Sequence, residues 1–126
     1  MSRTAQRLLL IATACLLSAV ASAHHSFAAE FLGDQTLTIA GTVREVWFKN
    51  PHVRYYVDVE ADDGSTETWD VRTSSPTILV RRGWSRDTIA EGDKVTIEGF
   101  LGRDGRKMLS LIRIELPDGT VLGQSY

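Results

Sequence analysis

Apolar and polar residues alternate along much of the chain from residue 36 onward, and this alternation predicts β-strands. In residues 53–60 the apolar side chains of Val53, Tyr55, Val57 and Val59 alternate with polar or amphipathic neighbours. A strand with this pattern packs one face on a core and leaves the other face to solvent. The first clear element is therefore a half-buried strand.

Several further segments extend the pattern. The other predicted strands are residues 36–48, a strand around Trp69 and Val71, residues 95–101, residues 108–116 and a short last strand at residues 120–122. The strand around Trp69 forms a hairpin with residues 53–60 across the turn Asp62-Asp63-Gly64. Gly41 lies within the first strand, and a glycine there indicates a bulge or sharp bend that lets one strand serve two faces of a barrel.

One short helix interrupts the strands. Ser75 is a capping residue, Pro76 suits the first turn, and Gly83 suits the left-handed end of a helix over residues 77–83. A helix between the third and fourth strands is the element order of an OB-fold, so we expect an all-β, small antiparallel β-barrel of this kind. A different small antiparallel barrel or sandwich is the alternative. We expect residues 36–126 to form this single domain and residues 24–35 to form an N-terminal arm.

The first 23 residues have a different character. A basic leader with Arg3 and Arg7 precedes an apolar run at residues 8–20, and Ala21-Ser22-Ala23 resembles a cleavage site. This pattern predicts a signal peptide, export to the periplasm and no stable membrane anchor after cleavage. The alternatives are an uncleaved anchor, for which the run is short, and a lipoprotein cut before Cys15, which lacks the usual upstream leucine.

Cleavage changes the composition of the chain. It removes the only cysteine, so neither a disulfide nor a thiolate site is expected, and it lowers the formal net charge from −2 to −4. Nucleic acid carries a dense negative charge that demands a basic surface. The composition therefore predicts no nucleic-acid partner.

The candidate metal ligands are the three histidines of the chain, His24, His25 and His52. Cleavage after Ala23 would give His24 a free α-amine beside its imidazole, and a second imidazole would complete a three-nitrogen site. Nitrogen-rich, tetragonal coordination suits copper(II). The alternatives are a terminus without a role for His24 and His25, and a backbone hydrogen bond for His52.

Aromatic and basic residues supply a second candidate site. Trp47, Tyr55 and Trp69 have the phase expected of core residues, whereas Phe48 and Tyr56 are candidates for exposed contacts. The arginines Arg81, Arg82 and Arg86 flank Trp84 after the helix, where they can contact an anionic partner or simply offset the helix dipole. Phe48, Tyr56, Trp84 and the three arginines are the predicted partner-binding residues.

Three sequence motifs resemble a known family. The segments His24-His25-Ser26-Phe27, Trp47-Phe48-Lys49-Asn50-Pro51-His52 and Arg81-Arg82-Gly83-Trp84-Ser85-Arg86-Asp87-Thr88 are similar to a family of small exported bacterial proteins, a domain of unknown function. The resemblance implies an exported β-domain and no assigned activity. His24 is also similar, in its chemistry alone, to the terminal histidine of copper chaperones that hold Cu(II) in a histidine brace.

No catalytic motif is present in the sequence. Ser26 beside the two histidines lacks a rigid frame, and the acidic residues of the 58–67 hairpin have the pattern of a solvated surface. We therefore expect a periplasmic, non-enzymatic binding protein that holds copper through His24. The alternative is an interaction module that docks a protein or small solute on the barrel face, and a copper oxidative enzyme is a more distant one.

Overall fold

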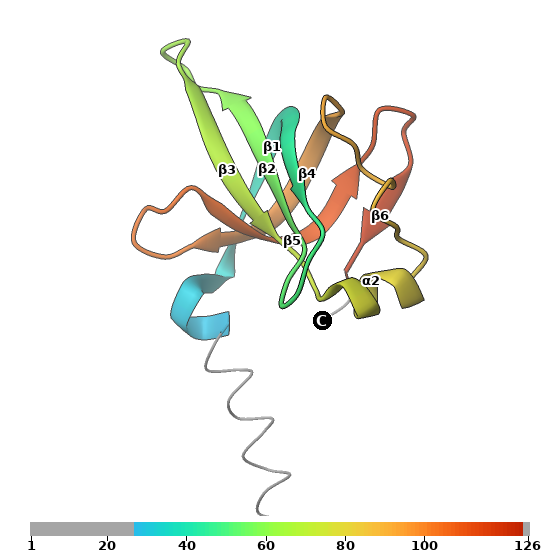
Figure 1. The fold of residues 1–126 in the computed structure, drawn as a ribbon. Coiled ribbons are helices and arrows are strands. Elements are labelled where there is room, and N and C mark those ends of the chain that lie inside the picture. Colours follow the sequence, from blue (N-terminus) through green and yellow to red (C-terminus); the bar gives the residue numbers. More distant parts are fainter. Residues whose placement is uncertain (1–26, 125–126) are drawn as a thin grey trace, which may run out of the picture. The chain divides into compact units, whose positions relative to one another are not determined.

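The structure is a computed structural model that describes residues 27–124. From residue 31 onward, six strands and the helix α2 follow one another in the order β1 (Phe31–Trp47), β2 (Arg54–Glu60), β3 (Thr66–Arg72), α2 (Pro76–Arg81), β4 (Lys94–Gly102), β5 (Met108–Glu115) and β6 (Val121–Gly123). The strands form one sheet in the order β3-β2-β1-β4-β5-β6 (Figure 1). The alternating segments of the sequence are therefore strands, as predicted.

An additional pairing closes this sheet into a ring. β3 pairs with β5 in parallel, with Asp70 opposite Met108 and Arg72 opposite Ser110, while every other pairing is antiparallel. The backbone N–H of Asp70 donates to the carbonyl of Lys107 at 3.0 Å where the two strands meet. The result is the predicted small OB-fold-like barrel, and β6 extends it beyond β5.

β1 serves two parts of the barrel, as predicted from Gly41. Its first part, to Thr42, pairs with β4, and its last part, from Thr42, pairs with β2. Gly41 lies at this exchange because a Cβ atom there would lie 2.3 Å from the carbonyl oxygen of Asp58. The two strand backbones can approach this closely only because the side chain is missing.

The inward side chains of all five long strands fill the barrel. Tyr55, Val57, Ile97, Leu109 and Ile114 are among those with no exposed surface. Burial of such residues removes apolar surface from water, which stabilises the fold by roughly 25 cal/mol per Å². This core holds the strands in place and leaves their outward side chains for other roles.

Helix α2 lies between β3 and β4, as predicted. The Ser75 side chain accepts a hydrogen bond from the Ile78 N–H, Pro76 occupies the first turn, and Gly83 has a φ of 89° just after the last residue. Leu79 is fully buried, and the Trp84 N–H donates to the Leu79 carbonyl at 3.0 Å. The helix is therefore fixed to the core by its inward side.

The chain divides into two compact units, residues 1–30 and 31–126. Residues 27–30, the described part of the first unit, are helical, and the second unit holds the barrel from the start of β1. β1 includes residues 31–35, where its pairing with β4 is irregular. Among residues 27–124, no helix is long and apolar enough to cross a membrane.

Candidate binding face on the outside of the barrel

The outward side chains of β1, β2 and β3 form two neighbouring rows across the strands. Trp47 pairs with Arg54, and Arg54 pairs with Arg72, which gives the first row. Glu45 pairs with Tyr56, and Tyr56 pairs with Asp70, which gives the second. Side chains in directly opposed positions of antiparallel strands lie on the same face of the sheet. We call these six residues the outer face.

A carboxylate holds the two arginines of the outer face together. Asp70 Oδ2 accepts from Arg54 Nη1 at 3.5 Å and from Arg72 Nε at 3.2 Å, and all three side chains are partly buried. Shared contact with one oxygen limits the freedom of both guanidinium groups. Two fixed guanidinium groups are suited to an anionic partner because each can donate several hydrogen bonds in a plane.

An exposed aromatic ring lies at the edge of this arrangement. Trp47 is 39% exposed, and Lys49 Nζ lies 4.3 Å from the centre of its ring. A cation at this distance from an indole ring is attracted to it. Trp47 thus presents an exposed aromatic ring with the Lys49 ammonium over it, directly across from Arg54 in the strand pairing.

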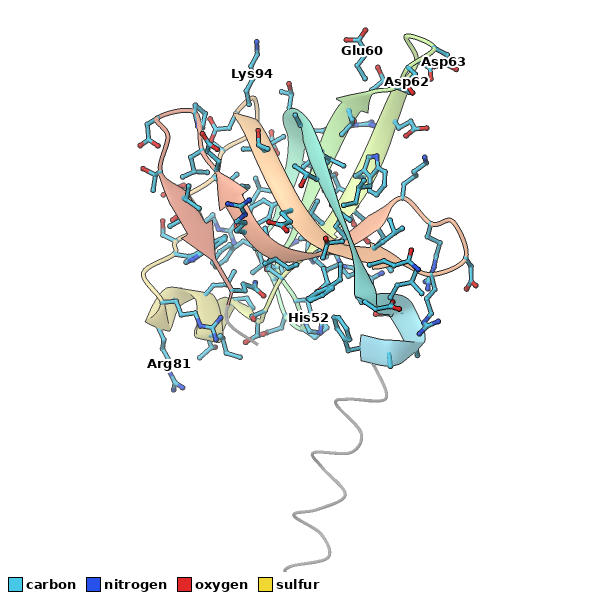
Figure 2. All side chains as sticks on the ribbon, turned by 180° about the vertical axis from the view of Figure 1, so that it is seen from behind. His52, Glu60, Asp62, Asp63, Arg81 and Lys94 are labelled. Carbon is cyan, nitrogen blue, oxygen red and sulfur yellow. The ribbon has the colours of Figure 1, made fainter. Side chains whose placement is uncertain are left out.

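The charge changes sign along the β2–β3 hairpin. Asp58 and Glu60 follow Tyr56 on the outward side of β2, and Asp62 and Asp63 occupy the turn. Asp63 accepts hydrogen bonds from the Ser65 hydroxyl and N–H, which lowers the pKa of its carboxyl. Figure 2 shows Glu60, Asp62 and Asp63 together at the end of the barrel opposite His52 and Arg81. The positive part of the hairpin is therefore its base.

The aromatic residues are placed partly as expected. Tyr55 and Trp69 belong to the core as predicted, and Tyr56 is half-buried on the outer face. Trp47 was expected in the core, and Phe48 was expected to be exposed; the structure reverses the two, because Phe48 packs against the core. The reason is the register shift between Val43 and Glu45, which turns Val46 inward and Trp47 outward.

The residues from the end of α2 to Arg86 also separate into two groups. Arg81, Arg82 and Arg86 are exposed, and Arg86 Nη2 donates to the carbonyl of Phe48 at 3.5 Å. Trp84, which was predicted to contact a partner, is 3% exposed and packs in the core with Leu79. Its contribution is to hold α2 and not to contact a ligand.

Of the three histidines, His52 alone lies within the described residues. His24 and His25 lie outside residues 27–124. His52 is exposed in the β1–β2 loop, and its Nδ1 lies 2.9 Å from the carbonyl oxygen of Thr73. This backbone contact is the alternative foreseen for His52. A carbonyl only accepts, so Nδ1 carries the proton and Nε2 of the neutral ring keeps its lone pair.

Thr73 makes the position of the His52 ring well defined. Its N–H and its hydroxyl both donate to the Val53 carbonyl at 2.9 Å, and the Val53 N–H donates to Ser74. Within residues 27–124, no three His, Cys, Asp or Glu side chains come together as a possible metal site. The copper site therefore stays a prediction that concerns His24 and His25 first.

Sequence reasoning did not identify Lys49, Arg54 and Arg72 as site residues. Arg54 is visible in the sequence as an outward position of an alternating strand. Its alignment with Trp47 and Arg72 depends on strand register, which periodicity alone does not determine. The sequence does contain one sign of this register: the apolar positions change phase between Val43 and Val46, which indicates that Trp47 faces outward.

Solved structures with a similar fold include single-stranded DNA-binding proteins. Two crystal structures of the mitochondrial protein Rim1 from S. cerevisiae match with TM-scores of 0.50 and 0.51 at 17% and 13% identity. They cover 68% and 75% of this chain and 96% and 100% of their own. The N-terminal domain of PriB from Thermoanaerobacter tencongensis matches with a TM-score of 0.48 at 18% identity, over 72% of this chain and 99% of its own.

These structures correct one expectation from the sequence. Nucleic acid was excluded as a partner because the mature chain has a net charge of −4, and that exclusion is wrong. Proteins described as single-stranded DNA-binding are built on this fold. The physical reason is that net charge describes the whole surface, whereas a ligand responds to local charge. The acidic residues lie at the hairpin turn, and Arg54 and Arg72 lie apart from them at the base of the hairpin.

At the level of sequence, the chain matches a family model but no curated protein. The model of a family of unknown function, DUF6152, matches residues 12–110, which include the strands β1 to β4 and helix α2. The chain therefore belongs to the DUF6152 family, whose function is unknown.

Proposed function

We propose that this protein is an exported, non-enzymatic binding module whose outer face holds nucleotide units, either free or within a single strand. The observation that carries the proposal is the exposure of Trp47 in register with Arg54 and Arg72. Export rests on the predicted signal peptide at residues 1–23. The sequence also predicts an interaction module on the barrel face, but for a protein or small solute and through Phe48, Tyr56 and the arginines near Trp84; of these residues only Tyr56 belongs to the outer face.

The chemistry of the outer face suits a ligand that is both flat and anionic. Trp47 offers a ring on which a base can stack, and Tyr56 lies one row away along the neighbouring strand. Arg54 and Arg72 can donate to phosphate oxygens. Asp70 and Glu45 balance these two positive charges within the outer face, and Lys49 over Trp47 adds a third, so we expect an affinity that is modest and sensitive to salt.

Other features of the barrel support this location. In OB-folds generally, the face of the second and third strands and the loops between strands 1 and 2 and strands 4 and 5 bind oligonucleotides and oligosaccharides. In this chain the first of these loops contains Lys49, and the second contains Arg103, Arg106 and Lys107. Basic residues therefore lie in both loops that border the outer face.

The test is fluorescence anisotropy with a labelled thymidine oligonucleotide, in competition with free thymidine monophosphate. We expect Trp47→Ala and Arg54→Gln each to weaken binding by about 5- to 160-fold, from the roughly 1–3 kcal/mol of one stacking or charged contact. Arg113→Gln, which removes an exposed arginine paired with Glu98, is the matched control. If thymidine monophosphate competes with the oligonucleotide, a free nucleotide is sufficient for binding. If it does not compete, binding requires the nucleic-acid strand.

Two outcomes would contradict the proposal. One is the absence of binding at low salt by a folded protein. The other is binding that Trp47→Ala and Arg113→Gln reduce equally, because the interaction would then depend on general charge and not on the outer face.

Copper binding is the second candidate function, and one observation favours it. The contact between His52 Nδ1 and the Thr73 carbonyl leaves Nε2 with its lone pair, and histidines that bind metals commonly donate the other ring nitrogen to such a carbonyl. The main ligands of the proposed site are the α-amine and imidazole that cleavage after Ala23 would give to His24. His25 or His52 would add a further nitrogen.

Copper titration of the processed protein tests this second candidate. A variant with one extra residue before His24 should bind copper(II) more weakly, because the amine then no longer belongs to the histidine. His25→Ala and His52→Ala measure the contribution of each remaining imidazole. Unchanged affinity in the extended variant would remove His24 from the site.

A further inference from the structure

Helix α2 presents apolar and basic side chains to solvent together. Ile78 is 42% exposed and Val80 is 57% exposed, while Leu79 between them is fully buried. Successive residues of a helix are 100° apart, so Ile78 and Val80 flank the outward position that Arg81 occupies. The outward side of α2 is thus an arginine with an aliphatic side chain on either side.

This surface is held in place by the core, and its charged residues are three arginines followed by one acidic residue, Asp87. Leu79 and Trp84 fix α2 to the core, so the exposure of Ile78 and Val80 is not the result of a loosely packed helix. From Thr73 to Arg86 the sequence contains three arginines and no Asp or Glu. Arg86 also reaches the neighbouring loop at Phe48.

The opposite end of the barrel has the reverse charge. Glu60, Asp62 and Asp63 lie at that end together with a single labelled cation, Lys94, and Arg81 points away from the barrel at this one (Figure 2). A negatively charged surface would attract the α2 end and repel the hairpin turn. Such a surface would therefore orient the molecule as well as hold it.

We propose that the α2 end of this protein docks on an anionic lipid surface through Ile78, Val80, Arg81 and Arg82. Basic side chains contact acidic headgroups while aliphatic ones enter the boundary with the acyl chains, as in interfacial helices. The apolar pair distinguishes this partner from a soluble anion, which arginines alone would bind. The outer face lies on β1, β2 and β3 and shares no residue with this docking surface, so each proposal can be tested independently of the other.

Vesicle sedimentation with the processed protein tests the proposal. We expect binding to vesicles of phosphatidylglycerol and phosphatidylcholine at 50 mM salt, and little binding to phosphatidylcholine alone or at 500 mM salt. Arg81→Gln with Arg82→Gln should reduce binding roughly 25-fold, at about fivefold for each basic residue. Ile78→Ser with Val80→Ser should also reduce it, without changing its dependence on salt.

Matched variants remove the same groups elsewhere. Lys94→Gln with Arg113→Gln takes two exposed positive charges from β4 and β5, and Val121→Ser takes an aliphatic side chain that is 55% exposed from β6. Neither should reduce binding by more than about twofold. Thermal unfolding of each variant, compared with the wild type, tests whether the substitutions leave the stability of the domain unchanged.

Three results would overturn the proposal. Equal binding to neutral and anionic vesicles would indicate adsorption through apolar side chains alone. An equal loss of vesicle binding in the matched variants and in the α2 variants would indicate attraction by the overall charge of the protein and not by α2. Binding to soluble polyglutamate but not to vesicles, lost in the same arginine variants, would identify an acidic protein as the partner.

Discussion

Tyr55 is the residue at which burial and polarity conflict most directly. Its side chain has no exposed surface, and its hydroxyl has no hydrogen-bond partner among the described residues. Burial raises the pKa of this phenol because the charged form would lie in an apolar interior. The ring therefore stabilises the core while the hydroxyl contributes nothing or a small cost.

Replacement of Tyr55 by Phe should remove a dependence of stability on pH. The unfolded chain releases the phenol proton near pH ~10, while the folded chain keeps it to higher pH. The stability of the wild type is unaffected by this group below pH ~10 and falls above it, by up to about 1.4 kcal/mol per pH unit. Urea unfolding between pH 8 and 11 should show a shallower fall in Tyr55→Phe, with Tyr56→Phe as the control.

At neutral pH the same substitution should leave stability unchanged or raise it by up to ~1 kcal/mol. A clear loss of stability in Tyr55→Phe at pH 7 would show that the hydroxyl has a partner.

Gly41 offers a second prediction for a single residue. A methyl group there would lie 2.3 Å from the Asp58 carbonyl oxygen, so Gly41→Ala should push β1 from β2 and cost roughly 2–4 kcal/mol. Gly123→Ala is the matched control, because its nearest contact would be 3.5 Å from the Ile112 oxygen. Equal midpoints of urea unfolding for the two variants would contradict this account.

At the scale of elements, the sequence predicts the strands and the helix α2 well because local rules determine them. Alternation defines β2 and β4, and Ser75, Pro76 and Gly83 define the two ends of α2. The outer face could not be predicted in the same way. It depends on the register of three strands and on the shift between Val43 and Glu45, which decides that Trp47 faces outward.

The attachment of α2 to the barrel gives a prediction for an element. Trp84→Ala should destabilise the protein by about 3–5 kcal/mol, since the side chain is 3% exposed and packs with Leu79. Val80→Ala, at an exposed position of the same helix, should change stability by less than ~0.5 kcal/mol. Thermal unfolding of both variants compares the two, and a mild effect of Trp84→Ala would contradict the role assigned to it.

At the scale of the whole molecule, composition alone was misleading about charge. The mature chain would have a net charge of −4, but the acidic residues Glu60, Asp62 and Asp63 gather at one end and Arg81 lies at the other (Figure 2). The sequence gives the order of these charged residues along the chain but not their positions in space. The barrel separates them because the β2–β3 turn precedes β3, whereas α2 follows its other end.

The parallel pairing of β3 with β5 makes the backbone of the barrel a circuit in which each of five strands has two neighbours. An open sheet frays from its outermost strands, whereas here β3 can separate only if pairings on both of its sides break. Amide deuterium exchange should therefore be slow in β3 and fast in β6, which pairs with β5 alone in the described part of the chain. Equally rapid exchange in both strands would mean that the circuit opens in solution.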